Sequence, residues 1–538
     1  MRIFDGTYWQ SGYLDYGLEA DDVRVAVRAW CVMEHLHDVH IPQRRSFRRV
    51  WDYMREIGVR RVAKKIQSRM AESLRDRRVM AFGCGRVLEA GEVVDLEPGA
   101  DVLFVAACHP PCVERIVVPR AWAFEAPSHL AERFNTADSL AWFDRSGTEP
   151  LPEGDDIAGW SRHAGFENEA LPPSLPQAIE NVLETLPPGA GRRLSVENPS
   201  PIRERTSPSP PKPSACSAVL FGLGNYAKVN IIPNLDRRIH VERVHEIDPT
   251  QIGRVANDPC GYDTCGEFRP GERYDMCLIA GFHHTHADLA VEALRAGSFA
   301  VVEKPLVTTR DQLSALLAAM QQNPGRLFAC FHMRYNPVWS LARRDLRWQP
   351  GREVHYQCIV HEIPLPARHW YNWPNSGSRL ISNGCHWLDH FLWMNEFAAP
   401  CRYDIWPAAN GDMHVSVELD NGAAFSMALT DQGSSRVGVR DHVELRAGDV
   451  TVTVDDGRRY FAERSAGVIR RAHNRSDPYR RMYQSVSSRV LSGGGGDSVA
   501  SVQTSSDLML SLEELYVRKR AARQSSDAGG SPVLRMQE

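Results

Sequence analysis

The spacing of apolar and polar residues changes along the chain and predicts three kinds of structure. In residues 46–76 apolar positions recur at helical spacing, which predicts two amphipathic helices. Residues 79–106 alternate and are interrupted by glycines, a pattern typical of short antiparallel strands joined by tight turns. From Ala218 apolar strands alternate with helical segments, and after Arg352 alternating strands dominate. These patterns predict a small β-rich module, a doubly wound α/β domain, and an α+β domain with an open, mostly antiparallel sheet.

Stretches of low complexity suggest where these parts begin and end. Residues 197–215 are rich in Pro and Ser and indicate an extended linker. The glycine-rich sequence SGGGGDS at 492–498 indicates a second, less marked boundary between structured parts. The polar end of the chain is predicted to be disordered. The expected organisation is a β-rich module over 1–130, an irregular segment and linker over 131–215, a nucleotide-binding domain over 216–338, an α+β domain over 339–520 and a disordered tail over 521–538.

Charge and composition exclude several classes of protein. The 63 basic and 67 acidic residues give a net charge of -4, which calls for neither nucleic acid nor an anionic membrane as a partner. No apolar run approaches the ~18 residues of a membrane span, and the first ten residues do not form a secretory signal, so a cytoplasmic location is expected. Between Arg44 and Arg78 there are 13 basic and four acidic residues. This excess could dock an acidic partner or could be the solvated face of the two helices.

The 12 cysteines do not form a pattern that predicts a metal site. Cys108 lies close to Cys112 and Cys260 lies close to Cys265, but neither pair has a second pair at a suitable spacing for tetrahedral zinc. We therefore expect reduced, mostly buried thiols and no metal.

A glycine-rich turn follows the apolar strand Ala218–Phe221 and precedes a predicted helix. Gly222 allows the tight turn, Gly224 lets a pyrophosphate approach the backbone, and Ala227 permits close packing of the helix. The first amides of that helix, with Asn225 and Tyr226 in the turn, would then bind the phosphates. This arrangement is typical of a dinucleotide-binding Rossmann domain.

An acidic residue follows the second predicted strand of this domain. Asp248 lies 21 residues after Ala227, where a carboxylate can accept hydrogen bonds from both ribose hydroxyls, and Glu246 could take the same role. Because a carboxylate would repel a 2′-phosphate, the cofactor is expected to be NAD or NADP, with NAD favoured.

Two later strand ends carry further candidate residues. The strand at 276–280 leads into a turn with His283, His284 and His286, and the strand at 299–302 leads into Glu303-Lys304-Pro305. In an open parallel sheet the ligand binds beyond the carboxyl ends of the strands, so these turns should lie on the same side of the sheet as the glycine loop.

With these motifs in this order, residues 218–517 resemble the Gfo/Idh/MocA oxidoreductases, the glucose-fructose and inositol dehydrogenase family. The matching segments are GLGNYAK, FHHTH, the EKP turn and FACFHMRYNP. The resemblance implies that Lys304 contacts both the nicotinamide ribose and the substrate hydroxyl. It also implies a cofactor site that comprises Gly222, Gly224, Asn225, Tyr226, Ala227, Asp248, His283, His286, Glu303, Lys304 and Pro305.

The last family motif is a helix with a catalytic histidine, which here reads SNGCHWLDHFLWM from Ser382. The resemblance implies that His386 is the acid or base, because an imidazole with a pKa of ~6.5 can take a hydroxyl proton near neutral pH. Ser382 stands where the family has an aspartate. Arg334, Asn336, Asp389 and His390 are further candidates for substrate contact. The aromatic-rich segment just before this helix adds Trp370, Tyr371, Trp373 and Arg379, whose side chains could stack on an apolar sugar face or serve in simple packing.

The first module is similar to the GroES-like domain of zinc-type alcohol dehydrogenases over residues 20–130. The similarity rests on Gly85-Arg86-Val87, Gly91, Pro98-Gly99 and the segment VERIVVPRAW. Ala81 occupies the position of the zinc-binding histidine, so this module is expected to bind no zinc.

The resemblance as a whole implies an NAD(P)-dependent dehydrogenase or reductase that acts on CH-OH groups. Hydride would pass between nicotinamide and a secondary alcohol or carbonyl of a sugar, a cyclitol or a related small molecule. The expected partners are this small-molecule substrate and further copies of the chain. Two alternatives remain: a non-enzymatic dinucleotide-binding regulatory protein, and a redox-neutral sugar enzyme that uses NAD.

Overall fold

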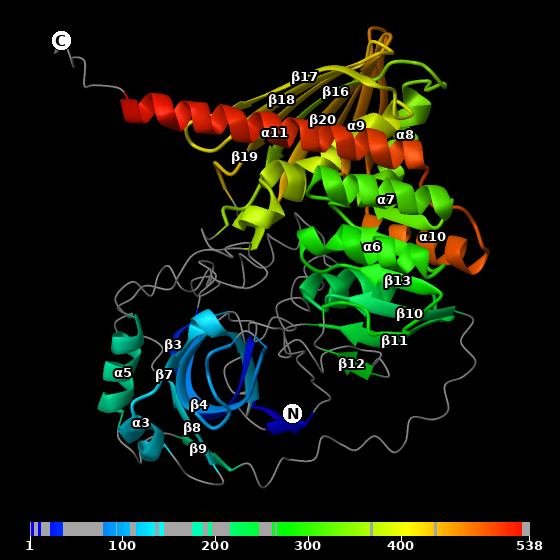
Figure 1. Cartoon of the computed structure of the whole chain (residues 1–538). Coiled ribbons are helices and arrows are strands. Elements are labelled where there is room, and N and C mark those ends of the chain that lie inside the picture. Colours follow the sequence, from blue (N-terminus) through cyan, green and yellow to red (C-terminus); the bar gives the residue numbers. More distant parts are fainter. Residues whose placement is uncertain are drawn as a thin grey trace, which may run out of the picture. The chain divides into compact units, whose positions relative to one another are not determined.

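The computed structural model divides into two compact units, which are described separately (Figure 1). The first comprises Met1–Pro233, Arg237–Tyr274 and Pro366–Pro374, and the second comprises Asn234–Asp236, Asp275–Leu365 and Asn375–Glu538. Within them the structure describes residues 2–4, 9–11, 22–35, 79–92, 94–107, 115–134, 139–144, 175–186, 192–195, 216–246, 261–263, 266–365, 370–434 and 438–529. The predicted helices of 46–76, the linker at 197–215, Asp248, the close cysteine pairs and the last nine residues lie outside these ranges.

The N-terminal part of the first unit is built on a curved, mainly antiparallel sheet (Figure 1). Its order is β7-β5-β4-β3-β8-β9, with β6 also paired to β3, and only β3 and β8 are parallel. A separate hairpin joins β1 to β2. The bounds are β1 Arg2–Phe4, β2 Trp9–Ser11, β3 Asp22–His35, β4 Val79–Ala90, β5 Asp101–Ala107, β6 Arg115–Pro119, β7 Ala123–Glu125, β8 Ser139–Asp144 and β9 Arg192–Ser195.

Two glycines let the central strands of this sheet approach each other closely. A Cβ on Gly83 would lie 2.1 Å from the Ala29 carbonyl oxygen, and one on Gly85 would lie 2.3 Å from that of Ala26.

The expectation of an irregular segment from 131 is wrong for its described parts. Apolar positions in that segment continue the module's core, and its elements are α3 Ser128–Arg133, which begins just before it, β8, α5 Leu175–Thr185 and β9.

The nucleotide-binding domain contains a six-stranded sheet in the order β12-β11-β10-β13-β14-β15. This is the strand order of a Rossmann fold, and the registered pairs are parallel. Strands β13 to β15 are almost wholly buried, which explains their continuous apolar sequences. The bounds are β10 Cys216–Phe221, β11 Ile239–His245, β12 Gly261–Asp263, β13 Met276–Ile279, β14 Phe299–Glu303 and β15 Leu327–Cys330, with helices α6 His286–Arg295 and α7 Arg310–Gln322.

The segment after the glycine loop is helical over residues 225–234, as the sequence predicts. It forms a π-helical turn over Ala227–Ile231 and a 3-10 turn over Ile232–Asn234.

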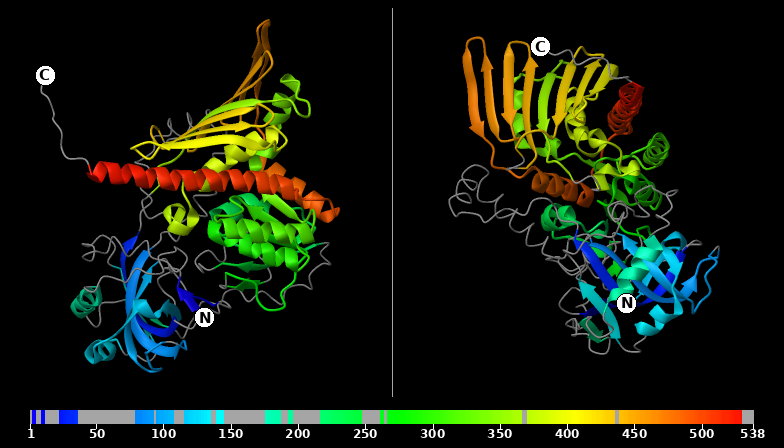
Figure 2. Two further views of the ribbon diagram at one scale, coloured as in Figure 1. Left: turned by 45° about the horizontal axis from the view of Figure 1, so that its top comes forward. Right: turned by 90° about the vertical axis from the view of Figure 1, so that its left-hand side faces the viewer.

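The C-terminal part of the second unit is an eight-stranded sheet with helices against one face (Figure 2). Its order is β17-β18-β19-β16-β20-β21-β22-β23, and only β16 and β19 are parallel. Alternate residues are buried, as the sequence pattern predicts. The strands are β16 His355–His361, β17 Pro400–Pro407, β18 Met413–Leu419, β19 Ala424–Thr430, β20 Arg440–Ala447, β21 Val450–Asp455, β22 Arg459–Arg464 and β23 Gly467–His473, and the helices are α8 Pro337–Asp345, α9 Cys385–Met394, α10 Pro478–Leu491 and α11 Val499–Gly529.

The glycine-rich segment at 492–498 is held against β15. The Asp497 N–H donates to the Leu327 carbonyl at 2.7 Å, and the Ala329 N–H donates to the Asp497 carboxylate at 2.7 Å. A Cβ on Gly496 would lie 1.9 Å from the Leu327 oxygen, so glycine is required for this close approach. The glycine-rich segment, predicted from the sequence as a boundary, is therefore a structured connection. Helix α11 continues to Gly529, beyond residue 521, where the disordered tail was expected to start.

No helix in the described parts of the chain is both long enough and apolar enough to cross a membrane. The described cysteines are free thiols, and all of them except Cys401 are buried. Burial raises the pKa of Cys84 to about 12, which makes this thiol unreactive near neutral pH.

Candidate active site

The glycine loop forms the candidate cofactor site of the first unit. Gly222 has a φ of +90°, which glycine adopts readily, and its N–H donates to the His245 carbonyl at 2.9 Å. Gly224 has no atom within 4 Å of the position of a Cβ. The open space at Gly224 is where a phosphate could approach the backbone, so the loop fits the pyrophosphate of a dinucleotide.

Glu246 lies at the end of β11 and contacts this loop directly. Its side chain is 8% exposed, and the carboxylate accepts a hydrogen bond from the Leu223 N–H. Glu246 therefore lies against the cofactor loop, whereas Asp248 lies outside the described residues. Asn225, Tyr226 and Ala227 form the start of the short helix, as the motif predicts.

Lys304 is the centre of the candidate catalytic group in the second unit. It follows β14, and its Nζ donates to the Ser382 carbonyl at 2.6 Å. Its positive charge also lowers the pKa values of His283 and His386, although burial has the larger effect on both. The charge of Lys304 therefore reaches both rings, and the role of these three residues at a catalytic site stays a prediction.

His386 lies in the first turn of α9, immediately after a π-helical turn over Leu380–Gly384. The His386 ring is 6% exposed and contacts the edge of His332, with 4.5 Å between ring centroids, while His332 stacks on Tyr479 at 4.3 Å. Among the described residues, His386 Nδ1 has no hydrogen-bond partner. Burial first, and then the His332 and Lys304 charges, lower the pKa of His386 well below its usual value, so the ring is neutral and can accept a proton.

The polar atoms of His286 and Glu303, two predicted cofactor residues, form hydrogen bonds within the protein. Both ring nitrogens of His286 lie near carbonyl oxygens, Nδ1 at 2.7 Å from Pro305 and Nε2 at 3.1 Å from Gly281. The Tyr483 hydroxyl donates to the buried carboxylate of Glu303. The expectation that His286 and Glu303 contact the cofactor does not fit these internal bonds. Pro305 follows a cis peptide bond.

Arg334 and Asp389, which the sequence predicts as substrate contacts, form an internal ion pair. Arg334 donates Nε to Asp389 Oδ2 at 2.8 Å and Nη2 to Oδ1 at 2.5 Å, while Nη1 contacts Asp497 at 2.6 Å. The Ser505 hydroxyl also donates to Asp389. Although burial acts in the opposite direction, the two carboxylates raise the pKa of Arg334 above its usual value. These polar groups hold α9, α11 and the 492–498 segment together, and a contact of Arg334 or Asp389 with the substrate stays a prediction.

Asn336 and His390 are also structural rather than accessible to a substrate. Asn336 caps α8 through the Val338 N–H at 3.1 Å and donates to the Gly457 carbonyl at 3.0 Å. His390 is fully buried, and its Nδ1 lies 3.1 Å from the Tyr356 hydroxyl. Their expected substrate contacts do not fit this burial and these partners.

The remaining substrate candidates are divided between the units. Trp370, Tyr371 and Trp373 belong to the first unit, where Trp370 contacts the edge of Tyr371 and Trp373 is 3% exposed. Arg379 belongs to the second unit, and its guanidinium lies 3.1 Å from Asp431 and 3.5 Å from Glu362. Neither acid was singled out from the sequence.

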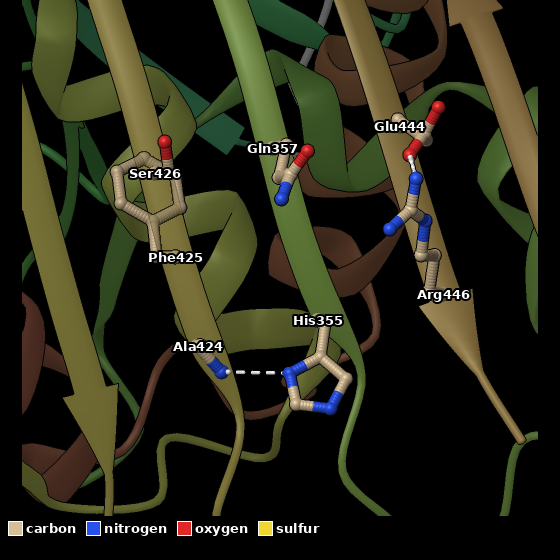
Figure 3. A pocket seen from close by; sticks show the side chains of 7 residues that line it. All are labelled: His355, Gln357, Ala424, Phe425, Ser426, Glu444 and Arg446. Carbon is tan, nitrogen blue, oxygen red and sulfur yellow. Dashed lines mark hydrogen bonds and ion pairs between the residues drawn. The ribbon is translucent and has the colours of Figure 1, made fainter.

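Other polar sites lie apart from these residues. A pocket on the exposed face of the eight-stranded sheet contains none of the predicted site residues; it is lined by His355, Gln357, Ala424, Phe425, Ser426, Glu444 and Arg446 (Figure 3). In the described residues, one group has ligand atoms close enough to share a metal: His129, Glu180 and Glu184, on α3 and α5. These side chains are largely exposed, and the absence of a metal stays a prediction.

Acid is expected to destabilise the second unit because its buried histidines resist protonation. Burial lowers the pKa values of His283, His386 and His390 well below that of a histidine in the unfolded chain, which is ~6.5. Below that pH the unfolded chain binds protons that the folded chain excludes. The free energy of unfolding should therefore decrease as the pH drops below about 6.5, by roughly 1.4 kcal/mol per pH unit for each such histidine.

Urea unfolding between pH 7.5 and 5 checks this expectation. A His386→Phe variant should show a shallower dependence on pH than the unaltered chain. Equal stability at both ends of this range would contradict the buried, neutral state of the three rings.

Comparison with known proteins gives a family match to the nucleotide-binding domain. Residues 217–331 match the model of the oxidoreductase family with an NAD-binding Rossmann fold, GFO_IDH_MocA. YteT of Bacillus subtilis (strain 168), which carries the name of an oxidoreductase, is 29% identical over 75 residues; the match spans 14% of this chain and 18% of YteT.

Solved structures similar to this chain include three oxidoreductases of low sequence identity. An oxidoreductase from Agrobacterium radiobacter in complex with NAD+, L-tartaric acid and magnesium is 14% identical, with a TM-score of 0.47 over 57% of this chain and 96% of that chain. The WlbA dehydrogenase from Bordetella pertussis with NADH and UDP-GlcNAcA is 15% identical, with a TM-score of 0.46 over 57% and 97%. A Gfo/Idh/MocA family oxidoreductase from Vibrio cholerae is 15% identical, with a TM-score of 0.45 over 58% and 99%.

The strand order of the six-stranded sheet and its glycine loop define a dinucleotide-binding α/β protein. Residues 217–331 also match the model of the Gfo/Idh/MocA oxidoreductase family, which describes an NAD-binding Rossmann fold. The cofactor of this domain is accordingly NAD or NADP.

Proposed function

We propose that the protein is an NAD-dependent oxidoreductase that interconverts a secondary alcohol and its carbonyl compound. The observation that carries this proposal is the hydrogen bond from Lys304 Nζ to the Ser382 carbonyl. It ties the lysine at the end of β14 to the helical turn that leads into His386. An ammonium group and a neutral imidazole are thereby held in one place, and this pair suits the removal of a proton from an alcohol.

The two side chains would have complementary roles. His386, which is neutral because burial lowers its pKa, would accept the hydroxyl proton of the substrate. The Lys304 ammonium would donate a hydrogen bond to the same substrate oxygen and stabilise its developing negative charge. Bound NAD supplies the hydride acceptor at nicotinamide C4. In the reverse direction Lys304 would polarise the carbonyl and His386 would return the proton.

The substrate class and the preferred cofactor are part of the same proposal. A sugar, a cyclitol or a related polyol offers the secondary hydroxyl that this pair requires. The Glu246 carboxylate, which bonds the Leu223 N–H, favours NAD because it would repel a 2′-phosphate. The proposal also includes a GroES-like N-terminal module, a cytoplasmic location and assembly into homo-oligomers.

A panel of sugars, cyclitols and hydroxy acids tests the function. We expect at least one of them to reduce NAD+, seen as a rise in nicotinamide absorbance. The Gly224→Val variant, with the cofactor loop blocked, should show no rise with the same substrate. If NADH binds and no substrate in either direction turns over, the non-enzymatic regulatory role replaces the enzymatic one.

A further inference from the structure

A carboxylate from the C-terminal helix α11 binds the segment that leads into α9. The Ser378 N–H donates to Glu513 Oε1 at 2.8 Å, and the Ser378 hydroxyl donates to Oε2 of the same carboxylate. The two residues are 135 positions apart, and no sequence motif marks Glu513. Burial raises the pKa of Glu513, and the two hydrogen bonds from Ser378 oppose that rise. Glu513 and Ser378 therefore form a specific contact, since a carboxylate inside the protein needs hydrogen-bond donors.

Ser378 supports the π-helical turn Leu380–Gly384 that follows it. Its hydroxyl oxygen accepts the Leu380 N–H at 3.2 Å, and its carbonyl accepts the Ser382 N–H at 3.0 Å. A serine that accepts N–H groups in this way fixes the start of a helical segment. Gly377, directly before it, has a φ of +72°, and a Cβ there would lie 2.7 Å from the Ile381 side chain. The backbone therefore enters the turn in one conformation, which glycine permits and the Ser378 hydrogen bonds hold.

The same turn carries the acceptor of the candidate catalytic lysine. The Ser382 carbonyl accepts the hydrogen bond from Lys304 Nζ at 2.6 Å, and His386 follows in the first turn of α9. A later part of α9 is held separately, through the ion pair of Asp389. A shift of Ser378 would therefore move the Ser382 carbonyl and the start of α9 while the rest of the helix stays in place. A misplacement of ~1 Å at a reacting group can cost about 10² in rate.

We propose that Glu513 is a positioning residue for the reaction: by binding Ser378, it fixes the turn that places the Ser382 carbonyl and His386. The proposal rests on the proposed function. Glu513 acts through Ser378 and not through a contact with the substrate. The C-terminal helix thus contributes to the geometry of the candidate active site, with a residue that lies far from every family motif in the sequence.

Kinetics of Glu513 variants test this role. Glu513→Met keeps the length of the side chain and removes both acceptor oxygens, so kcat should fall about tenfold or more. Glu513→Gln keeps an oxygen for the Ser378 N–H and should retain most of kcat. Glu514→Met is the matched control, because Glu514 is the next residue of α11 and pairs with Arg310 at the surface. Full activity of Glu513→Met, or an equal loss in the two methionine variants, would overturn the proposal.

A double-mutant cycle shows whether Glu513 acts through Ser378. Ser378→Ala is a smaller change that removes only the hydroxyl, and it should itself lower kcat. Because the two residues form one contact, Glu513→Met should cost a smaller factor in kcat in the Ser378→Ala background than in the unaltered chain. The same factor in both backgrounds would contradict an action through Ser378.

Amide hydrogen exchange gives a readout that does not depend on turnover. In Glu513→Met the peptide over residues 378–386 should exchange about tenfold faster or more, while Glu514→Met should leave its exchange unchanged. If exchange is faster and the unaltered chain turns over no substrate, the hold of Glu513 on the turn stands and the proposed function fails. Faster exchange with full kcat would reduce Glu513 to a structural residue and overturn the proposal. Unchanged exchange would overturn it as well.

Discussion

Replacement of Lys304 by methionine is expected to lower kcat by about 10²-fold or more. Methionine keeps much of the length and apolar surface of the side chain but removes the ammonium group that binds the Ser382 carbonyl and would bind the substrate oxygen. A positioned charged donor at a developing oxyanion contributes on the order of 10²–10³ in rate. The expected loss therefore lies in kcat and kcat/KM.

Steady-state kinetics with the best substrate of the panel measures this effect. Lys519→Met is the control, because Lys519 pairs with Asp404 on α11 and β17 and has no part in the proposed chemistry. Turnover by Lys304→Met at the rate of the unaltered enzyme would contradict the role assigned to this lysine.

Replacement of Arg334 by methionine is expected to lower the free energy of unfolding of the second unit by about 3–5 kcal/mol. Arg334 is 9% exposed and Asp389 is fully buried, so the variant leaves a carboxylate in the interior without its cation. Asp497 loses its contact with the guanidinium at the same time. The loss in free energy of unfolding comes from the buried charge left unpaired, which is far more destabilising than the loss of a solvent-exposed salt bridge.

Arg310→Met is a matched control for this effect. Arg310 also contacts two acids, Asp507 and Glu514, but its side chain is 42% exposed. Solvent screens such pairs, so the control should lose no more than about 1 kcal/mol. Urea unfolding of both variants measures the difference, and equal losses would show that Arg334 is not the central cation of a buried network.

Local patterns were sufficient to predict the elements that surround the cofactor loop. The glycine spacing at Gly222 and Gly224 and the apolar strands before the EKP turn depend on backbone geometry within short segments. The alternation after Arg352 likewise predicts the sheet of the second unit, because one face of each strand is buried. These features need no knowledge of contacts between distant residues.

The long-range partners of several site residues could not be predicted from the sequence. Asp389 matches a family motif, but its partners are 55 and 116 residues away in the sequence, and only the fold shows that Arg334 and Ser505 use its oxygens internally. Glu362 contacts Asn383 across 21 residues and carries no motif. The segment at 492–498 was predicted from its glycines to be a boundary between structured parts, whereas Gly496 is needed for contact with β15.

Titration with NADH tests the central claim most directly, through energy transfer from tryptophan to the bound nicotinamide. The full chain should bind NADH, and Gly224→Val should abolish binding while the protein stays folded. Gly224 lies outside the left-handed backbone region, so valine fills the open space of the loop without the strain of a positive φ. Failure of the intact, folded chain to bind NADH or NADPH, or unchanged binding by the variant, would contradict the assignment of this loop to the cofactor.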